Sequence, residues 1–219
     1  MPETTRERIA SSGKEIAPPL GTVLIEQGQP TDSVYFPIDG AVISLTRSLE
    51  DGMLIEVGVV GHEGFGGLAA VFDPRRHLDC GIVQAEGAIL QVPLAVVSEE
   101  IAHDEVRQVL FRYANAFMMQ IAQTALCNRL HTIEQRLTRW ILAMQDRTRT
   151  EELRLTQQFL SHMLGTRLAG VNEAVQSLVR AGLIRHARNR IAIIDRPGLE
   201  AASCECYRVV RDEFDRLVR

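Results

Sequence analysis

The chain has 219 residues, of which 46% are hydrophobic and 24% charged, with a formal net charge of −4 at pH 7. These values are typical of a globular protein of two modest domains, and the longest apolar stretch, around residues 88–97, is too short and too broken to cross a membrane. Because no charged leader with an apolar run opens the chain, a cytoplasmic protein without a membrane partner is expected. The four cysteines lack Cys-x-x-Cys spacing, which argues against a disulfide frame or a zinc knuckle.

The first part of the chain has the pattern of an all-β domain. A polar segment over residues 1–19 predicts a short helix or arm, and from residue 20 to 97 short β-rich runs alternate with turn residues. Twelve of the sixteen glycines lie before residue 98, which places most turns in this half. The pattern predicts a small β-barrel or jelly roll as a first domain over residues 1–97.

Residues 98–128 predict one long helix with Ser98 as its cap, so that residues 98–130 form a dimerisation helix that leads into a hinge near residues 130–132. At about 1.5 Å per residue this helix would span ~46 Å, more than a barrel of this size covers. Its stripe of residues at steps of three and four either packs inside the chain or pairs with a second copy, and the length favours a two-fold homodimer. The predicted dimerisation residues are Val106, Leu110, Tyr113, Phe117, Ile121, Thr124 and Asn128.

The second domain, predicted over residues 131–219, contains two short helices that meet at a glycine. Thr156 is suited to cap the first helix, Gly165 permits a tight turn, and Thr166 is suited to cap the second helix. Gly182 marks the end of the second helix, and residues 183–194 predict a basic hairpin. The segment predicts a helix-turn-helix with a wing, although an ordinary helix pair in a helical core has the same local pattern.

The distribution of charge favours a winged helix-turn-helix. From residue 136 to 190 there are ten arginines and four acids, a balance of +6, whereas residues 1–130 hold nine Lys and Arg and seventeen Asp and Glu, a balance of −8. Positive charge is therefore concentrated around the helix pair, where the phosphates of a polyanion need it. Double-stranded DNA is the expected partner.

A β-barrel, a long helix and a winged helix-turn-helix follow one another in this order, with the run Gly-Phe-Gly-Gly-Leu at residues 64–68 after a predicted strand. The combination resembles the Crp/Fnr family of bacterial transcription regulators over residues 20–194. The resemblance implies an α+β fold with a cyclic-nucleotide-binding-like barrel, a homodimer on palindromic DNA, a signal received by the barrel or the central helix, and contact with RNA polymerase. No enzyme is expected, because no P-loop, Gly-x-Ser-x-Gly or His-Glu-x-x-His motif occurs.

The resemblance also allows the cyclic AMP site to be tested. In members that bind cyclic AMP, a glutamate holds the ribose and an Arg-Ser pair holds the phosphate, whereas the matching positions here are Gly67 and Leu78-Asp79. Arg75 and Arg76 lie nearby in the sequence. Because a phosphate facing a leucine and a carboxylate lacks its charged partner, no tight binding of a cyclic nucleotide is expected.

Iron–sulfur and haem cofactors are not expected either. The iron–sulfur members use a cluster of N-terminal cysteines, and none precedes Cys80. Cys204 and Cys206 are predicted to lie two apart on one C-terminal helix and to point to different faces, which favours buried structural thiols over a redox pair or a metal site. Single histidines are more often surface or capping residues than haem ligands, and this interpretation applies to His62, His77 and His103.

The resemblance places base contacts on the second helix of the pair. Where the family presents Arg-Glu and then Arg one turn later, this chain has Leu168, Ala169 and Glu173, so its target sequence is expected to differ. Arg167 is predicted to contact a guanine. The other predicted DNA-binding residues are Thr156, Gln157, Thr166, Leu168, Asn172, Glu173, Gln176, Arg188 and Arg190.

An effector, if the protein has one, is expected to be a small molecule other than a cyclic nucleotide. Its predicted pocket lies between the glycine-rich run and the central helix, lined by Phe65, Gly66, Gly67, Leu68, Phe117, Ile121 and Thr124. Because the usual base-contacting triplet is absent, one alternative function stays open. In that alternative the chain is a ligand-binding or protein-interaction module whose helix-turn-helix no longer reads DNA.

Overall fold

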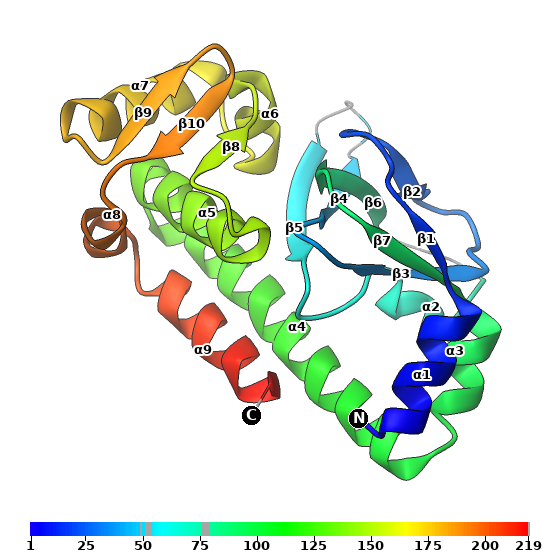
Figure 1. Ribbon diagram of the computed structural model, residues 1–219. Helices are drawn as coiled ribbons and strands as arrows, with labels where there is room; N and C mark the ends of the chain where they lie inside the picture. Colours follow the sequence, from blue (N-terminus) through cyan, green and yellow to red (C-terminus); the bar gives the residue numbers. More distant parts are fainter. Residues whose placement is uncertain (49, 51–53, 76–78, 219) are drawn as a thin grey trace.

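The computed structural model describes residues 1–48, 50, 54–75 and 79–218. Arg76, His77 and Leu78, weighed above as possible ligand contacts, lie outside the described residues. A β-rich domain leads through a long helix into a mainly helical C-terminal domain, and a last helix returns alongside the long one (Figure 1). Among the described helices, none combines the length and apolar character that a membrane crossing requires.

The N-terminal domain consists of two antiparallel sheets, as the alternation of β-rich runs and turns predicts. Apolar side chains point between them, where Ile43, Val83 and Ile89 are buried in one cluster. The first sheet has the order β1-β7-β3, made of β1 (Lys14–Ile16), β7 (Ile89–Pro93) and β3 (Ser33–Pro37). The second has the order β2-β6-β4-β5, made of β2 (Val23–Ile25), β6 (Cys80–Ala85), β4 (Val42–Ser48) and β5 (Leu54–Val60).

Three short helices cover this domain before the long helix α4 (Asp104–Leu130) begins: α1 (Glu3–Ser12), α2 (Leu68–Phe72) and α3 (Leu94–Glu100). The prediction of one helix starting at Ser98 is wrong, because Ser98 lies inside α3. The α3 residues Leu94 and Val97 are buried in one cluster with Ile9 of α1, and Glu100 pairs with Arg8 at 2.8 Å. These contacts hold α3 on the barrel, so the chain turns before α4 starts.

The barrel covers much of the predicted dimerisation stripe. Val106, Leu110, Tyr113 and Phe117 are only 6–7% exposed, and the Tyr113 hydroxyl donates a hydrogen bond to the Phe65 carbonyl at 2.9 Å. Because these four side chains are buried within their own chain, they have little surface left for a second copy, which argues against their predicted role in dimerisation. The other three positions, Ile121, Thr124 and Asn128, are partly buried.

The C-terminal domain is built on α5 (Ile133–Thr148), which a capping box between Thr132 and Gln135 begins. Apolar residues at helical spacing, among them Leu137 and Ile141, form one core with Leu160, Val175 and Leu178. The remaining elements are α6 (Gln157–Met163), α7 (Leu168–Arg180), α8 (Arg196–Ala202), α9 (Cys206–Val218) and a sheet of order β8-β10-β9 made of β8 (Glu152–Arg154), β10 (Arg190–Ile193) and β9 (Ile184–Ala187).

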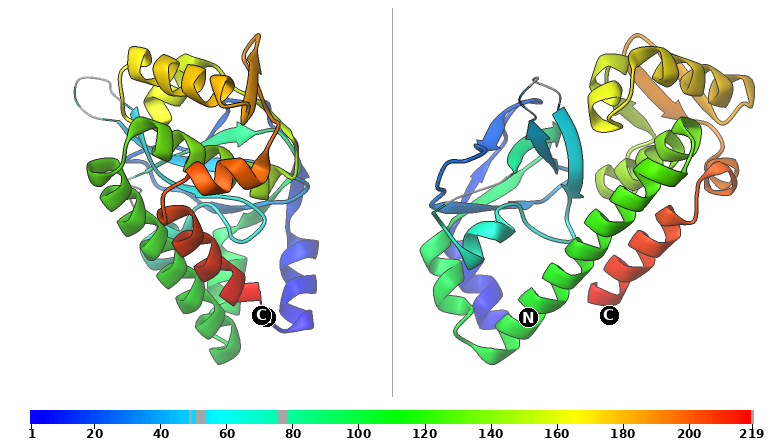
Figure 2. Two further views of the ribbon diagram at one scale, coloured as in Figure 1. Left: turned by 90° about the vertical axis from the view of Figure 1, so that its left-hand side faces the viewer. Right: turned by 180° about the vertical axis from the view of Figure 1, so that it is seen from behind.

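Helix α9 lies alongside α4 (Figure 2), with Asn115 donating to Glu213 across the contact at 3.4 Å. The prediction that two cysteines of this helix point to different faces is wrong. Cys204 precedes α9 and Cys206 begins it, so a turn separates them and both side chains are buried with Cys127 of α4.

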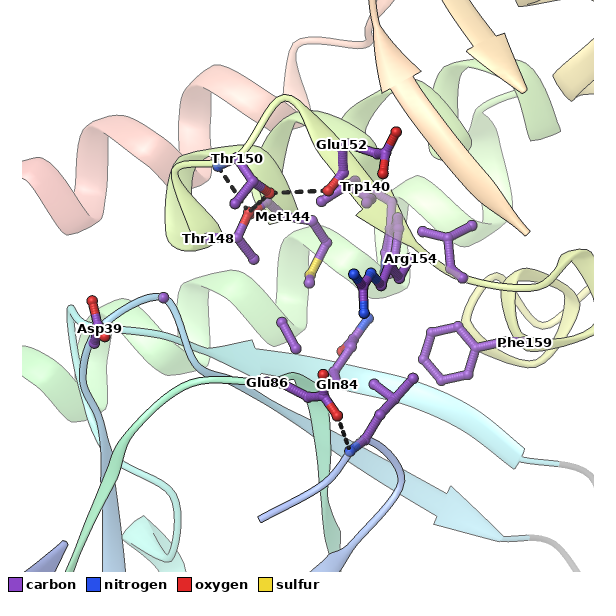
Figure 3. Close-up of a pocket in the computed structure, with 15 residues that line it drawn as sticks. Asp39, Gln84, Glu86, Trp140, Met144, Thr148, Thr150, Glu152, Arg154 and Phe159 are labelled. Carbon is purple, nitrogen blue, oxygen red and sulfur yellow. Dashed lines mark hydrogen bonds between the residues drawn. The ribbon is translucent and has the colours of Figure 1, made fainter. Parts of the chain in front are cut away.

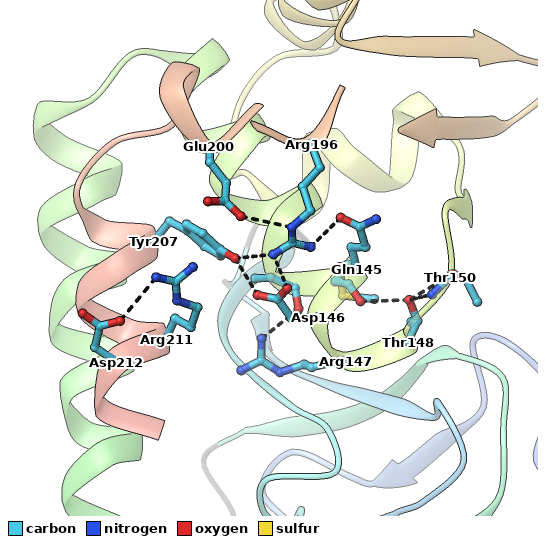
Figure 4. A network of polar contacts seen from close by, with 12 residues as sticks. Gln145, Asp146, Arg147, Thr148, Thr150, Arg196, Glu200, Tyr207, Arg211 and Asp212 are labelled. Carbon is cyan, nitrogen blue, oxygen red and sulfur yellow. Dashed lines mark hydrogen bonds and ion pairs between the residues drawn. The ribbon is translucent and has the colours of Figure 1, made fainter. Parts of the chain in front are cut away.

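A polar network centred on Arg196 fixes α8 and α9 to α5 (Figure 4). The Arg196 guanidinium contacts Asp146 at 2.6 Å and Glu200 at 3.0 Å, and it donates to the Tyr207 hydroxyl at 2.7 Å. Tyr207 in turn donates to Asp146 at 2.8 Å. Burial and this carboxylate raise the pKa of Tyr207 to about 12, so the phenol stays protonated at neutral pH.

The C-terminal domain packs directly on the barrel. Val42 and Val59 of the barrel are buried in the same cluster as Trp140, Leu160 and Met163 of the C-terminal domain. Inside this contact the carboxylate of Glu56 accepts hydrogen bonds from Trp140 Nε1 at 3.1 Å and from Ser44 Oγ at 2.8 Å. At its edge Arg147 pairs with Glu63 at 2.6 Å, with both side chains less than 9% exposed. The two domains therefore share a polar contact within an apolar one.

Candidate nucleic-acid interface

The first helix of the predicted pair begins as the sequence indicates. Thr156 Oγ1 accepts a hydrogen bond from the Phe159 amide at 3.0 Å, which confirms Thr156 as the cap of α6. Its neighbour Gln157 is the first residue of α6 and is partly exposed. Gly165 follows with φ +55°, a left-handed conformation that glycine adopts without steric cost. Thr156 and Gln157 are thus available at a helix start.

The second helix begins one residue later than predicted. Arg167, not Thr166, occupies the cap position of α7, and its side chain makes no capping hydrogen bond. Thr166 closes the preceding turn instead, because its amide donates to the Ser161 carbonyl at 3.0 Å. Arg167 is therefore exposed at the amino end of α7, where free amide groups and the helix dipole favour an anion.

Helix α7 has one apolar face and one open face. Val171, Val175 and Leu178 are fully buried against α5 and α6. On the open side the exposed positions are Arg167, Leu168, Ala169, Glu173, Gln176 and Arg180. All of these side chains except that of Ala169 are of types that commonly contact DNA. Glu173, Gln176 and Arg180 follow one another along the helix at spacings of three and four.

Asn172 differs from these residues because it is partly buried. Its Oδ1 is buried and has no hydrogen-bond partner among the described residues. Reaching a base edge requires this side chain to turn outward, so the structure places it less favourably than Gln176.

The predicted wing is a hairpin of β9 and β10. Arg188 and Asn189 occupy its tip with φ of 46° and 63°, the left-handed pair that a two-residue hairpin turn requires. Arg188 is exposed to solvent. Arg190 is also exposed, but it pairs with Glu152 at 2.6 Å, which partly neutralises its positive charge. That partner lies on β8, a third strand that the sequence analysis missed because only three residues, with Leu153 alone buried, form it.

The amino end of α7 lies near the barrel. Arg167, Leu168 and Thr166 line an open groove together with Leu54 of β5 and Ile133 of α5. Gly165 also faces β5, since a Cβ built on it would lie 3.5 Å from Ile55. The amino end of α7 and the edge of the barrel are thus neighbours in this arrangement.

The loop predicted to hold an effector is packed with side chains. The Phe65 ring lies between Phe36 and Tyr113, with ring centroids 5.1 and 5.2 Å away. Gly66 pairs with Tyr35 in an isolated bridge, and a Cβ added there would meet Ile43 at 3.3 Å. Gly67, Phe117 and Leu68 lie in the same packed region, with only Leu68 partly exposed. At these five of its seven predicted residues the expected pocket is therefore filled by the barrel's own core, whereas Thr124 lines a separate small cavity with Glu56 and Trp140.

The charged residues near the predicted phosphate position are engaged with one another. Asp79 pairs with Arg47 at 2.6 Å, and Arg75 pairs with Asp73 at 2.8 Å. The Arg75 pair lowers the pKa of Asp73 to about 2. Three of these four side chains are 49–85% exposed and that of Asp79 is 20% exposed, so solvent screens both pairs and they contribute little to stability.

A cavity of about 260 Å³ lies between the barrel and the C-terminal domain (Figure 3). It is lined from the barrel by Asp39, Gln84 and Glu86 and from the C-terminal domain by Trp140, Arg154 and Phe159, among others. Gln84 is 4% exposed, and both polar atoms of its amide lack a hydrogen-bond partner among the described residues. This cavity combines aromatic walls with unused hydrogen-bonding capacity.

Comparisons with known proteins identify both domains. Residues 19–104 match the cyclic nucleotide-binding domain family, and residues 135–202 match the Crp-like helix-turn-helix domain family. Together the two matches span most of the chain, in the order that the fold displays. The chain belongs to the Crp/Fnr family. A search of curated proteins found no match to this Crp/Fnr member.

Solved structures of the same fold span nearly the whole chain. FixK2 from Bradyrhizobium japonicum has a TM-score of 0.74 at 17% identity, covering 88% of this chain and 98% of its own. The c-di-GMP responsive regulator CLP from Xanthomonas campestris has a TM-score of 0.70 at 15% identity, with coverages of 88% and 99%. A transcriptional regulator of the CRP family from Thermus thermophilus has a TM-score of 0.71 at 16% identity, with coverages of 87% and 96%. This Crp/Fnr member therefore has the fold of a transcription regulator.

Proposed function

We propose that this Crp/Fnr member regulates transcription as a homodimer that binds palindromic DNA, and that its signal acts at the contact between the barrel and the C-terminal domain. The observation that carries the proposal is the open face of α7, which exposes Arg167, Glu173 and Gln176, together with the exposed Arg188 of the wing. In a two-fold dimer the half-site centres lie about 34 Å apart. Contact with RNA polymerase is implied by the family.

The open face of α4 supports the dimer. Phe111, Met118 and Leu126 are 56%, 61% and 42% exposed, although they lie on a helix whose other faces are covered by the barrel and α9. Together with Ala122 they recur at steps of seven and four, which makes one apolar stripe along the helix. A second copy is the partner that the family resemblance implies for this stripe.

The packing of the barrel supports a signal other than a cyclic nucleotide. Neither the filled glycine-rich loop nor the Arg47–Asp79 pair favours a cyclic nucleotide, so we propose a different small molecule, bound in the cavity lined by Gln84 and Trp140. Iron–sulfur and haem cofactors are not part of this proposal. Calorimetric titration with cyclic AMP and cyclic GMP tests the first point, and micromolar affinity for either would refute it.

DNA binding is tested by fluorescence anisotropy on DNA from upstream of the protein's own gene and on random DNA, at two salt concentrations. Arg167→Ala should weaken binding to the specific site by about 1–3 kcal/mol and relax the preference at one base pair per half-site. Arg6→Ala, which removes the same charge from the exposed side of α1, is the matched control and should leave binding unchanged.

Two results would contradict the proposal. Equal loss on specific and random DNA would reduce Arg167 to a phosphate contact, so base readout would have to come from elsewhere. Absence of salt-dependent binding to either DNA, with and without cell extract as a source of effector, would favour the alternative function of an interaction module that no longer reads DNA.

A further inference from the structure

Three cysteines and one histidine meet where the long helix, the hinge and α9 come together. Cys127 lies in the last turn of α4, His131 directly follows that helix, Cys204 lies in the turn after α8, and Cys206 begins α9. One potential ligand atom from each residue lies within 4.8 Å of those of the other three. No local sequence motif indicates this group, because Cys127 and His131 lie more than seventy residues before Cys204 and Cys206 in the chain.

Two of the six distances between ligand atoms in this cluster are close to those of a tetrahedral metal site, and the other four are within 4.8 Å. Cys127 Sγ and Cys204 Sγ are 3.6 Å apart, and Cys206 Sγ and His131 Nδ1 are 3.4 Å apart. With Zn–S of about 2.3 Å and Zn–N of about 2.05 Å, tetrahedral angles require S···S of about 3.8 Å and S···N of about 3.6 Å. The two measured edges are thus within ~0.2 Å of the expected ones.

The burial of the cluster also fits a closed structural site. Cys127, Cys204 and Cys206 are 0%, 3% and 0% exposed, and they form a cluster of their own, separate from the three apolar cores. Ordinary buried cysteines pack against apolar neighbours, whereas these thiols face one another and an imidazole. Four protein ligands without an open position are typical of structural zinc sites.

Groups around the cluster are placed as outer partners of metal ligands usually are. His131 Nδ1 faces Cys206, and its other ring nitrogen, Nε2, lies 3.4 Å from a carboxylate oxygen of Glu205. This arrangement orients the imidazole and selects Nδ1 as the ligand atom. Gln123 Nε2 donates to Cys206 Sγ at 3.0 Å, a hydrogen bond that stabilises a thiolate.

A positive charge close to the cluster offsets the charge of the complex. Zn²⁺ with three thiolates and a neutral imidazole carries a net charge of −1. Arg139 of α5 lines the same groove as Cys206, and its Nε has no hydrogen-bond partner among the described residues. Arg139 therefore has an unused hydrogen-bond donor and a positive charge beside the negative complex.

We propose that Cys127, His131, Cys204 and Cys206 bind one Zn²⁺ ion in a tetrahedral structural site. The ion joins the end of α4 to the start of α9. Its ligand His131 lies one residue before Thr132, the cap of α5. It therefore fixes the hinge between the dimerisation helix and the DNA-binding domain. The proposal depends on these side chains alone and stands independently of the target DNA or the effector.

The test uses the full-length protein purified under reducing conditions. Metal content per chain is measured by mass spectrometry, and the absorption spectrum is recorded after replacement of the metal by Co²⁺. One Zn²⁺ per chain is expected, and the Co²⁺ form should show sulfur-to-cobalt charge transfer with the intense visible bands of tetrahedral coordination. Cys206→Ser should lose the metal, whereas the control Cys80→Ser, a half-buried cysteine on β6, should keep it.

The histidine variants keep the test valid if Cys206→Ser does not fold. His131→Cys should retain one metal per chain because it replaces one ligand by another, and His131→Ala should bind at least about tenfold more weakly. Wild-type protein purified without bound metal would overturn the proposal, whether or not its three thiols react with a thiol reagent. An octahedral Co²⁺ spectrum would also overturn it. A Cys127–Cys204 disulfide in the reduced preparation would also overturn it, because it would assign the short S···S distance to a redox pair.

Discussion

Replacing Glu56 by glutamine tests how the two domains are held together. Glu56 of β5 is 7% exposed, and Ser44 of β4 and Trp140 of α5 donate to its carboxyl group. A glutamine has the same shape and keeps both contacts, since its carbonyl accepts from Trp140 and its amide donates to the Ser44 hydroxyl. The substitution therefore removes the charge and leaves the packing unchanged.

The magnitude follows from the pKa of this carboxyl. Burial raises the pKa of Glu56 from an ordinary 4.5 to about 7, against the lowering effects of its hydrogen bonds and of Arg139 and Arg147. At about 1.4 kcal/mol per pH unit, ionised Glu56 costs the folded state roughly 3 kcal/mol. The folded protein keeps this proton up to about pH 7, whereas the unfolded chain releases it near pH 4.5. The stability due to Glu56 is therefore full below about pH 4.5, falls as pH rises towards about 7, and stays low above that.

Glu56→Gln should thus be close to wild type in stability at about pH 5 and more stable by up to roughly 3 kcal/mol at about pH 8. The assay is urea unfolding followed by far-UV circular dichroism and by fluorescence of Trp140, the only tryptophan, across this pH range. Glu105→Gln, an exposed carboxylate in the first turn of α4, serves as control and should show the wild-type pH dependence. The same slope of stability against pH in Glu56→Gln and wild type would refute the reasoning.

Two further substitutions test the proposed dimer and the proposed signal site. Met118→Glu places a charge on the open face of α4 and should weaken self-association at least tenfold in analytical ultracentrifugation. The control Phe72→Glu changes an equally exposed residue on α2 and should leave self-association unchanged. If Met118→Glu dimerises as wild type does, the interface lies elsewhere. Ala85→Leu adds apolar volume to the cavity beside Gln84, so it should raise stability by roughly 1 kcal/mol and change DNA affinity without an added effector; greater stability with unchanged affinity would separate the cavity from signalling.

The winged helix-turn-helix was predictable because its signals are local. A cap at Thr156, left-handed turns at Gly165 and Gly182, and the apolar stripe of α7 each depend on a few neighbouring residues. The one-residue error at the start of α7 has the same origin. Threonine is a favourable cap residue, but Thr166 lies in the turn before α7, where its amide donates to the Ser161 carbonyl. That hydrogen bond depends on how α6 ends.

The use of the faces of α4 was not predictable from periodicity. A helical stripe indicates that residues are covered but not by what, so the side facing Phe65 was assigned to a second copy. The open side carries Phe111, Met118 and Leu126 mixed with polar residues, and its pattern is weaker. The cysteine cluster was missed for a related reason, since it depends on α9 returning beside α4, a contact that no local spacing encodes.

The contacts tie the C-terminal helices and the end of α4 into one unit that packs on the barrel. Helices α5, α8 and α9 are fixed to one another by the Arg196 network, and the cysteine cluster fixes α9 to the end of α4, so the DNA-binding domain and the central helix are tied together at the hinge. The barrel meets the DNA-binding domain through the Glu56 contact and the Arg147–Glu63 pair. Movement of the DNA-binding domain that carries α7 away from β5 therefore requires these two polar contacts and the apolar contact around them to break. The cavity lined by Gln84 lies in the same contact, so we expect the proposed ligand to act on this step.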